Sequence, residues 1–292
     1  MNTWKPNLDA ITLGMYEKAL SDELTWPQRL SAAREANFDF VEISIDDSDE
    51  RIKRLDWNAT QRSILRQASQ DSGVPIQSMS LSAHRRFPLG GQDSKVRQEG
   101  LDIFKKAIQF AVDVGIRYIL LAGIDVYYEE STEQTREDFL KGLELGFEWA
   151  SQAGVVLALE NWDIRLDSLT KVMNYVNYFN SPWFQAYVDI GNLAYAGYDV
   201  LTELDAARGH IAAVHVKDTL RGQLRYVSLG EGIVPFSKAF SRLAAIGFQG
   251  PIALELWTAD LPNSLEIVTA GNAWIRARMA EGWRAYYEDL KE

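Results

Sequence analysis

The stretch IAAVHVKD, residues 211–218, is a short apolar run that ends in a histidine, a lysine and an aspartate. A parallel strand buried on both faces has this composition, with polar groups only where the strand emerges. Three other segments repeat the pattern, namely VVLALENWD (155–163), FQAYVDIGN (184–192) and GPIALELW (250–257). They place Glu160, Asp189 and Glu255 where His215 stands in the first stretch. We therefore predict four ligand-type side chains at the exits of four successive strands.

Eight strand patterns alternate with eight helical patterns along the chain, which predicts an α/β fold with a parallel sheet. A (β/α)8 TIM barrel typically needs ~250 residues, so one barrel domain over residues 1–292 fits the length. No Pro/Gly/Ser-rich linker interrupts the chain. A doubly wound open sheet is the alternative. No G-x-G-x-x-G or P-loop motif supports it, and ligand-type residues on four successive strands suit a ring of strand exits better than one crevice.

The composition excludes several classes of function. Thirty basic and 41 acidic residues give a net charge of -11, which disfavours nucleic-acid and anionic-membrane binding. No apolar run approaches the roughly 20 residues of a membrane span. The N-terminal MNTWKPNLDA lacks the pattern of a signal peptide, and the absence of cysteine excludes disulfides and thiolate chemistry. We expect a cytoplasmic protein.

The four ligand-type residues indicate a metal site only when they are considered together. A single carboxylate at a strand end is usually solvated or caps a helix, and a lone histidine in an apolar strand is more often a core residue. In a barrel, however, the carboxyl ends of all strands converge on one mouth. Glu160, Asp189, His215 and Glu255 then form an all-N/O ligand set for one divalent ion, with zinc and manganese both suitable.

Basic residues cluster after the first, third and seventh strand patterns of this acidic protein. The segments at residues 82–90 and 217–234 are predicted to be long loops, which in compact domains are usually functional. Surface arginine and lysine are commonly only solvated, but an anionic substrate would need a local basic pocket. The candidates for binding its phosphate are Lys18, His84, Lys217 and Arg221, with Arg85 and Arg86 beside them.

The chain resembles a known family over nearly its whole length. The stretches that carry the resemblance are LGMYEKAL, FDFVEISIDD, SLSAHRRFPLG, AIQFAVDVGIR, GIDVYY, NSPWFQ, DIGNL, GHIAAVHVKDT and LGEGIV. They resemble the L-ribulose-5-phosphate 3-epimerases (L-xylulose-5-phosphate 3-epimerases) of L-ascorbate utilisation, in the xylose-isomerase-like TIM barrel superfamily. The resemblance implies an isomerase whose metal is held by Glu160, Asp189, His215 and Glu255. The sequence departs locally at ALENWD, where the family more often has AMEIMD, but it retains Glu160.

The chemistry of such an epimerase suits these residues. The C3 hydrogen of a 2-ketose is acidic because C2 is a carbonyl, and a metal at O2 and O3 would polarise that carbonyl. One carboxylate would remove the C3 proton to give a cis-enediolate, and a second would reprotonate the opposite face. Glu160 and Glu255, three strands apart in the ring, are the predicted bases. The predicted reaction interconverts L-xylulose 5-phosphate and L-ribulose 5-phosphate.

Three other functions compete with this prediction. An aldose–ketose isomerase generally needs a second metal, to which Glu42, Asp125 and Asp163 could contribute. A DNA-repair phosphodiesterase with three metals would need more histidines than the three present. A metal-stabilised binding module would show a closed coordination shell. The expected partner is a small ketose phosphate, with no nucleic acid and no membrane; a homodimer is an open alternative to a monomer.

Overall fold

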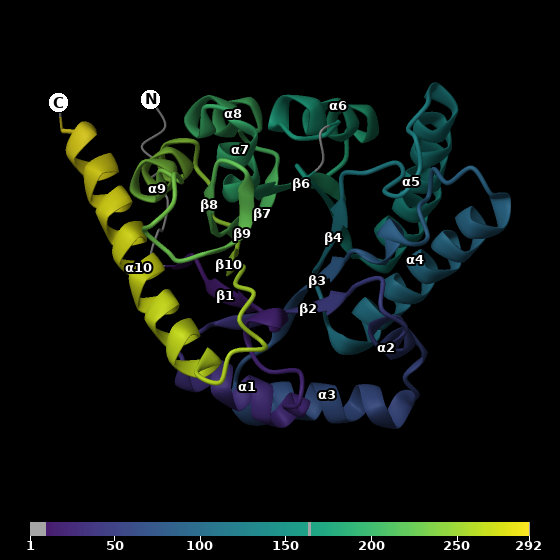
Figure 1. Cartoon of the computed structure of the whole chain (residues 1–292), viewed down its shortest axis with the longest axis horizontal. Helices are drawn as coiled ribbons and strands as arrows, with labels where there is room; N and C mark the ends of the chain where they lie inside the picture. Colours follow the sequence, from purple (N-terminus) through teal and green to yellow (C-terminus); the bar gives the residue numbers. More distant parts are fainter. Residues whose placement is uncertain (1–9, 163–164, 292) are drawn as a thin grey trace.

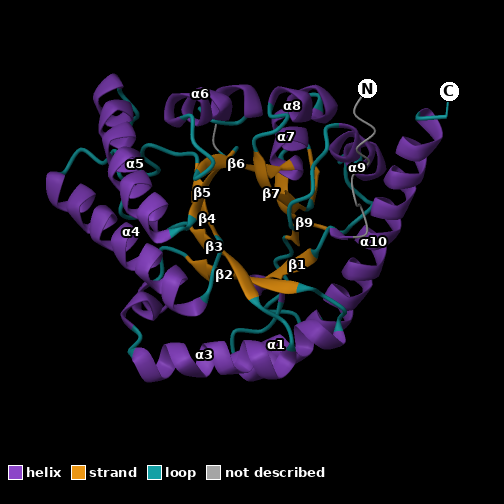
Figure 2. Cartoon of the chain, turned by 180° about the vertical axis from the view of Figure 1, so that it is seen from behind, coloured by secondary structure: helices purple, strands orange, loops and turns teal. Residues whose placement is uncertain are grey.

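The computed structural model describes residues 10–162 and 165–291. Eight parallel strands close into a barrel in the order β1-β10-β7-β6-β5-β4-β3-β2, and Figure 2 shows the helices arranged around this ring. The barrel strands are β1 (Leu13–Tyr16), β2 (Phe40–Ile45), β3 (Ile76–Leu81), β4 (Tyr118–Ala122), β5 (Val156–Glu160), β6 (Phe184–Asp189), β7 (Ile211–Val216) and β10 (Ile252–Leu254). The predicted (β/α)8 barrel is therefore confirmed.

The helices lie outside the ring and cover the strands (Figure 1). They are α1 (Trp26–Glu35), α2 (Asp49–Ile52), α3 (Ala59–Ser72), α4 (Ser94–Val114), α5 (Glu133–Ala153), α6 (Leu169–Phe179), α7 (Ile190–Ala196), α8 (Val200–Ala206), α9 (Phe236–Ala245) and α10 (Ser264–Asp289), with short 3-10 turns η2 (Glu17–Ala19), η3 (Lys53–Asp56) and η4 (Ala83–Arg85). None of these helices in the described part of the chain is long and apolar enough to cross a membrane.

Local sequence signals set the ends of several helices. Asn58 and Gln61 form the capping box that opens α3, and Gly73 ends this helix with a left-handed φ of 71°. Gly115 and Gly154 end α4 and α5 in the same way. The Asn58 side chain accepts a backbone N–H at the start of α3, whereas at the three C-terminal ends the backbone N–H of each glycine donates to a carbonyl of the last turn.

The alternation of side chains along each strand divides the buried residues into two layers. In β2, Val41, Ile43 and Ile45 point outward and join the large apolar core beneath the helices. Glu42 and Ser44 alternate with them and point into the barrel. Here the apolar filling is small, with Leu120, Ala158, Tyr187 and Ala213 as its buried members. The upper barrel interior is consequently polar, and this is where the site lies.

The segment 217–234, predicted as a loop, instead contains an antiparallel hairpin. Strands β8 (Asp218–Leu220) and β9 (Gln223–Val227) pair next to the barrel mouth. The buried Asp218 carboxylate accepts hydrogen bonds from the backbone N–H groups of Gly230, Gly232 and Val234, at 2.8, 3.0 and 3.3 Å. One side chain therefore ties the hairpin to the loop that leads into α9.

The packing of α4 against α5 gives a stability prediction. A Cβ atom at Gly146 of α5 would lie 2.0 Å from a ring carbon of the fully buried Phe104 of α4. We expect Gly146→Ala to lower the free energy of unfolding by about 1–3 kcal/mol through overpacking, although Ala is about 1 kcal/mol better than Gly in an exposed helix. Urea denaturation of Gly146→Ala, with and without Phe104→Leu, measures this. A stabilised single variant, or no recovery in the double variant, would contradict the contact.

Candidate active site at the barrel mouth

Strand register brings the four predicted ligand residues together. Asp189 of β6 pairs with His215 of β7, and His215 pairs with Ala253 of β10, two residues before Glu255. The His215 Nδ1 atom lies 3.3 Å from Glu160 Oε1 and 3.7 Å from Glu255 Oε2. Ligand atoms of Glu160, Asp189 and His215 all lie within 4.8 Å of one another, and all three residues are buried. The predicted set is thus a contiguous cluster at the carboxyl ends of the strands.

The orientation of His215 is fixed from the side opposite to the other three ligand residues. Its Nε2 atom lies 2.6 Å from Glu42 Oε1, so Nε2–H donates to the carboxylate and Nδ1 faces Glu160 and Glu255. Glu42 Oε2 accepts further hydrogen bonds from Ser78 Oγ and Tyr187 OH, both at 2.7 Å. Burial and the charge of Glu42 hold the pKa of Tyr187 well above its ordinary value, so the phenol remains a donor.

Lys217 lies inside the same cluster. Its Nζ atom is 2.6 Å from Asp189 Oδ2 and 2.7 Å from Glu255 Oε2, and the side chain is buried. Burial alone would lower the pKa of Lys217, but Asp189 and Glu255 raise it above its ordinary value. Burial opposes ionisation of Glu255 too, yet Lys217 and His215 lower its pKa to about 2. Both groups are therefore charged at neutral pH.

Glu160 and Asp189, the other two carboxyl groups of the cluster, ionise less readily than a carboxyl group in water. Burial raises the pKa of Glu160, and burial likewise raises that of Asp189, against the attraction of Lys217. Asp189 Oδ1 also accepts a hydrogen bond from the backbone N–H of Asn192 at 2.9 Å. The cluster has more carboxyl groups than cations, and a further positive charge bound beside them would favour their ionised forms.

The residues present fit a divalent metal. Glu160, Asp189, His215 and Glu255 offer oxygen and nitrogen donors from four neighbouring strands of the ring, in a buried and acidic environment. Histidines that bind metals almost always donate their other ring N–H to a carboxylate or carbonyl, which fixes the tautomer. Glu42 is in that position for His215. The donor set and its support thus match what a divalent-metal site with oxygen and nitrogen ligands requires.

The other predicted phosphate contacts lie in different surroundings. The Lys18 ammonium is paired with Asp46 Oδ2 at 2.5 Å and lies 4.9 Å from the ring centre of Trp257. His84 is buried against Phe104, with its Nε2 atom 3.2 Å from the carbonyl oxygen of Gly100. Burial lowers the pKa of His84 to about 4, so it is neutral at pH 7. Arg221 is exposed at the turn between β8 and β9. Among the four, the structure brings only Lys217 into the carboxylate cluster.

The residues considered for a second metal do not form a second group of ligands beside the first. Glu42 is occupied by His215, Ser78 and Tyr187. Asp125 is buried and accepts a hydrogen bond from Thr135 Oγ1 at 2.6 Å. Asp163 lies outside the described residues. Within the described part of the chain, one group of ligand-type residues is close enough to hold a metal.

The barrel mouth also contains residues that the sequence patterns do not identify as functional. Trp257 Nε1 donates to Glu255 Oε1 at 3.0 Å, and the Arg225 guanidinium stacks on the Trp257 ring with Cζ 4.1 Å from its centre. The supporting role of Glu42 had one signal in the sequence, the single charged residue within the buried strand FVEISI. Trp257 and Arg225 had no comparable signal, because their roles arise from contacts between distant segments.

Comparisons with known proteins agree with this architecture. The family model described as xylose isomerase-like TIM barrel matches residues 30–278. The chain is 50% identical over 272 residues to L-ribulose-5-phosphate 3-epimerase UlaE of Escherichia coli O1:K1 / APEC, covering 93% of this chain and 96% of that protein. It is also 50% identical to the protein of that name from Salmonella heidelberg (strain SL476), covering 92% and 95%.

Solved structures show the same fold at low sequence identity. An L-ribulose 3-epimerase structure matches with a TM-score of 0.77 at 20% identity, covering 97% of this chain and 98% of the other. The 3-keto-D-glucoside 4-epimerase YcjR from E. coli matches with a TM-score of 0.75 at 19% identity, covering 91% and 99%. These likenesses concern the fold, whereas the identity to the curated relatives extends over nearly the whole chain. The chain therefore belongs to the xylose isomerase-like TIM barrel family and, within it, to the L-ribulose-5-phosphate 3-epimerases.

Proposed function

We propose that this chain is a metal-dependent isomerase that interconverts L-xylulose 5-phosphate and L-ribulose 5-phosphate by proton transfer at C3. The relatives that bear the name L-ribulose-5-phosphate 3-epimerase, 50% identical over 93% of the chain, support the reaction. The observation that carries the mechanism is the convergence of Glu160, Asp189, His215 and Glu255 in one buried cluster. A cytoplasmic location, a role in L-ascorbate degradation and a homodimer remain predictions.

The proposed metal ligands are Glu160, Asp189, His215 and Glu255. A divalent ion held there, zinc or manganese, would supply Lewis-acid polarisation of the C2 carbonyl and so acidify the C3 hydrogen. The protein contributes the support of that set. Glu42 keeps Nδ1 of His215 facing the carboxylates, and Lys217 holds Asp189 and Glu255 in place.

Glu160 and Glu255 are the proposed bases. They stand on β5 and directly after β10, with β6 and β7 between them, and both approach Nδ1 of His215. One carboxylate takes the C3 proton of the ketose, which leaves a cis-enediolate, and the other delivers a proton to the opposite face. Trp257 restrains Glu255 through its indole N–H, so this carboxylate is oriented before the substrate arrives.

Four residues remain proposed contacts for the phosphate, namely Lys18, His84, Lys217 and Arg221. Their surroundings favour this role to different degrees. Arg221 is exposed on the hairpin, whereas Lys18 lies beside Trp257 and is already paired with Asp46. His84 is neutral and could offer only a neutral hydrogen bond. Lys217 is engaged by two carboxylates, which supports a role in positioning Glu255 more directly than one in holding phosphate.

The reaction can be tested by proton exchange in D2O. With L-ribulose 5-phosphate and wild-type protein, we expect deuterium to enter at C3 and L-xylulose 5-phosphate to form, because each proton transfer exchanges with solvent. NMR spectroscopy follows both, and a chelator should stop them. Exchange at C1 with formation of an aldose would instead identify an aldose–ketose isomerase.

The two bases can be separated by amide variants. Glu160→Gln and Glu255→Gln should each abolish epimerisation, because one of the two proton transfers is lost. One of the variants should still exchange the C3 proton of a single epimer, since the other base remains. Circular dichroism verifies that each variant is folded. Full epimerase activity in either variant would show that its carboxylate is not a base.

The role of Glu42 gives a prediction for metal affinity. His215→Ala should cut metal content, and Glu42→Gln should weaken binding by roughly 10- to 100-fold, because the second partner of a ligating histidine is lost. Competition with a chromophoric chelator measures the dissociation constant for Zn²⁺ and Mn²⁺. Glu203→Gln is the matched control, because Glu203 is a buried carboxylate that accepts from Thr170 N, away from the cluster. Unchanged metal content in His215→Ala would refute the ligand assignment.

A further inference from the structure

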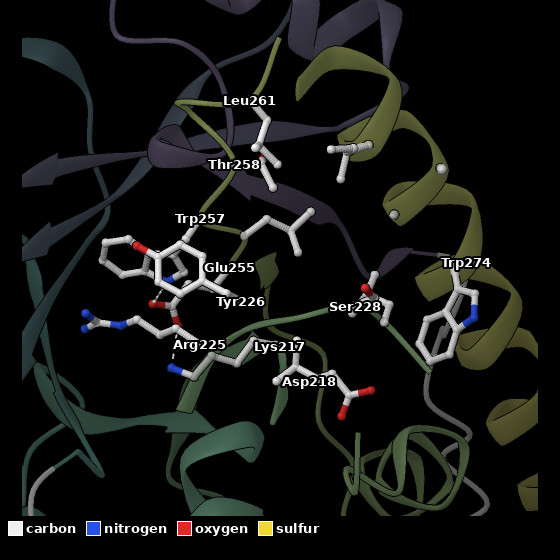
Figure 3. A pocket seen from close by; sticks show the side chains of 16 residues that line it. Lys217, Asp218, Arg225, Tyr226, Ser228, Glu255, Trp257, Thr258, Leu261 and Trp274 are labelled. Carbon is white, nitrogen blue, oxygen red and sulfur yellow. Dashed lines mark hydrogen bonds and ion pairs between the residues drawn. The ribbon is translucent and has the colours of Figure 1, made fainter. Parts of the chain in front are cut away.

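A cavity of about 390 Å³ lies at the barrel mouth, between the hairpin β8–β9 and α10 (Figure 3). Lys217 and Glu255 of the carboxylate cluster line this cavity. Figure 3 shows the Lys217 side chain extending to the Glu255 carboxylate. Lys217 thus belongs both to the cluster that we propose as the metal site and to the wall of an open volume.

The Lys217 ammonium binds one chosen oxygen on each of two carboxylates. Asp189 Oδ1 accepts from the backbone N–H of Asn192 at 2.9 Å, and Glu255 Oε1 accepts from the indole N–H of Trp257 at 3.0 Å. The other two oxygens, Asp189 Oδ2 and Glu255 Oε2, lie 2.6 and 2.7 Å from Lys217 Nζ. At both carboxylates a neutral N–H group therefore holds one oxygen and the ammonium holds the other.

The oxygen of Glu255 that Lys217 binds also faces the histidine ligand. Glu255 Oε2 lies 3.7 Å from His215 Nδ1, and this nitrogen lies 3.3 Å from Glu160 Oε1. An ion that joins His215 Nδ1 to Glu160 and Glu255 reaches Glu255 through the same oxygen as the ammonium. That oxygen has a second lone pair, but two cations on one buried oxygen repel each other strongly, because little water screens them.

Glycine at position 191 makes room for this lysine. A Cβ atom at Gly191 of α7 would lie 2.6 Å from Lys217 Cγ and 3.1 Å from Asp189 Oδ1. The backbone of α7 therefore fixes the lysine stem near Cγ, and only rotation about the bonds beyond Cγ can carry the ammonium away from the carboxylates. The adjoining cavity provides the volume for that movement.

We propose that Lys217 is an internal competitor of the metal, whose ammonium leaves Asp189 Oδ2 and Glu255 Oε2 as the divalent ion binds and returns as it dissociates. Lys217 thereby sets how tightly the ion is held. The contacts that keep the two carboxylates in place before the ion arrives are the contacts that the ion must break. The inference rests on the proposed metal-dependent function, and it gives Lys217 a role other than the phosphate contact predicted from the sequence.

The first test removes the ammonium and measures metal affinity. Lys217→Met keeps an unbranched stem beside Gly191 but carries no charge. The dissociation constants for Zn²⁺ and Mn²⁺ should fall by roughly 10- to 150-fold, the equivalent of one charged hydrogen bond that the ion no longer has to break. Competition with a chromophoric chelator measures these constants. Unchanged or higher values would show that Lys217 supports the ligands instead of competing with the ion, and would overturn the inference.

The second test uses the wild-type chain, and so it does not depend on whether Lys217→Met folds. In a crystal structure of the zinc-loaded protein, Lys217 Nζ should lie beyond hydrogen-bond distance of Asp189 Oδ2 and Glu255 Oε2, and the side chain should point into the cavity. Zinc bound at the four proposed ligands with both Lys217 contacts retained would overturn the inference.

The controls separate this inference from the proposed function. Lys106→Met removes an exposed lysine of α4 that pairs with Asp56 at 2.8 Å, and it should leave both dissociation constants unchanged. If the wild type binds neither ion at the cluster, the proposed metal dependence fails and this inference fails with it. If the wild type binds the ion and Lys217→Met binds it no more tightly, only this inference fails. Tighter binding in Lys217→Met of a chain that does not epimerise L-ribulose 5-phosphate would support the competition and overturn the proposed reaction.

Discussion

The barrel mouth is organised by the need to neutralise buried carboxylates. Glu42, Glu160, Asp189 and Glu255 point into one buried volume, where an isolated charge costs far more than in water. Burial opposes the charge of His215, but Glu42 and Glu160 raise its pKa well above the ordinary value, so His215 and Lys217 are the cations within this volume. Every carboxylate contacts at least one of them. The contacts join β2, β5, β6, β7 and β10, so the geometry of the site and closure of the ring are linked.

Side chains alternate between the two faces of each strand, and so the same barrel has an apolar core outside the strands and a polar site inside them. The outward residues of each strand build the apolar layer beneath the helices, and the inward residues meet across the barrel. Inward positions of β2, β3 and β6 supply Glu42, Ser78 and Tyr187, which together orient His215. Glu42, Asp189 and His215 therefore stand on strands of the barrel, whereas Arg225 and Trp257 belong to the connections that follow the barrel strands.

Local chemistry and strand pattern predicted much of this arrangement. The capping box at Asn58 and Gln61 and the terminal Gly73 mark helix ends within a few residues, and Glu160, Asp189, His215 and Glu255 stand at recognisable strand exits. What could not be predicted depends on contacts between distant segments. Nothing near Lys217 in the chain indicates that Asp189 and Glu255 surround it, and nothing near His84 indicates burial against Phe104. The hairpin within 217–234 was also missed, because its short strands lack a clear apolar alternation.

The position of Lys217 has a consequence for the order of assembly. In small zinc-dependent domains the ligands repel one another until the ion arrives, so metal binding and folding are one event. Here an ammonium from the chain itself already bridges Asp189 and Glu255. Because this internal counter-ion already offsets the charge of Asp189 and Glu255, folding of the barrel does not require an ion from solution to neutralise these two carboxylates.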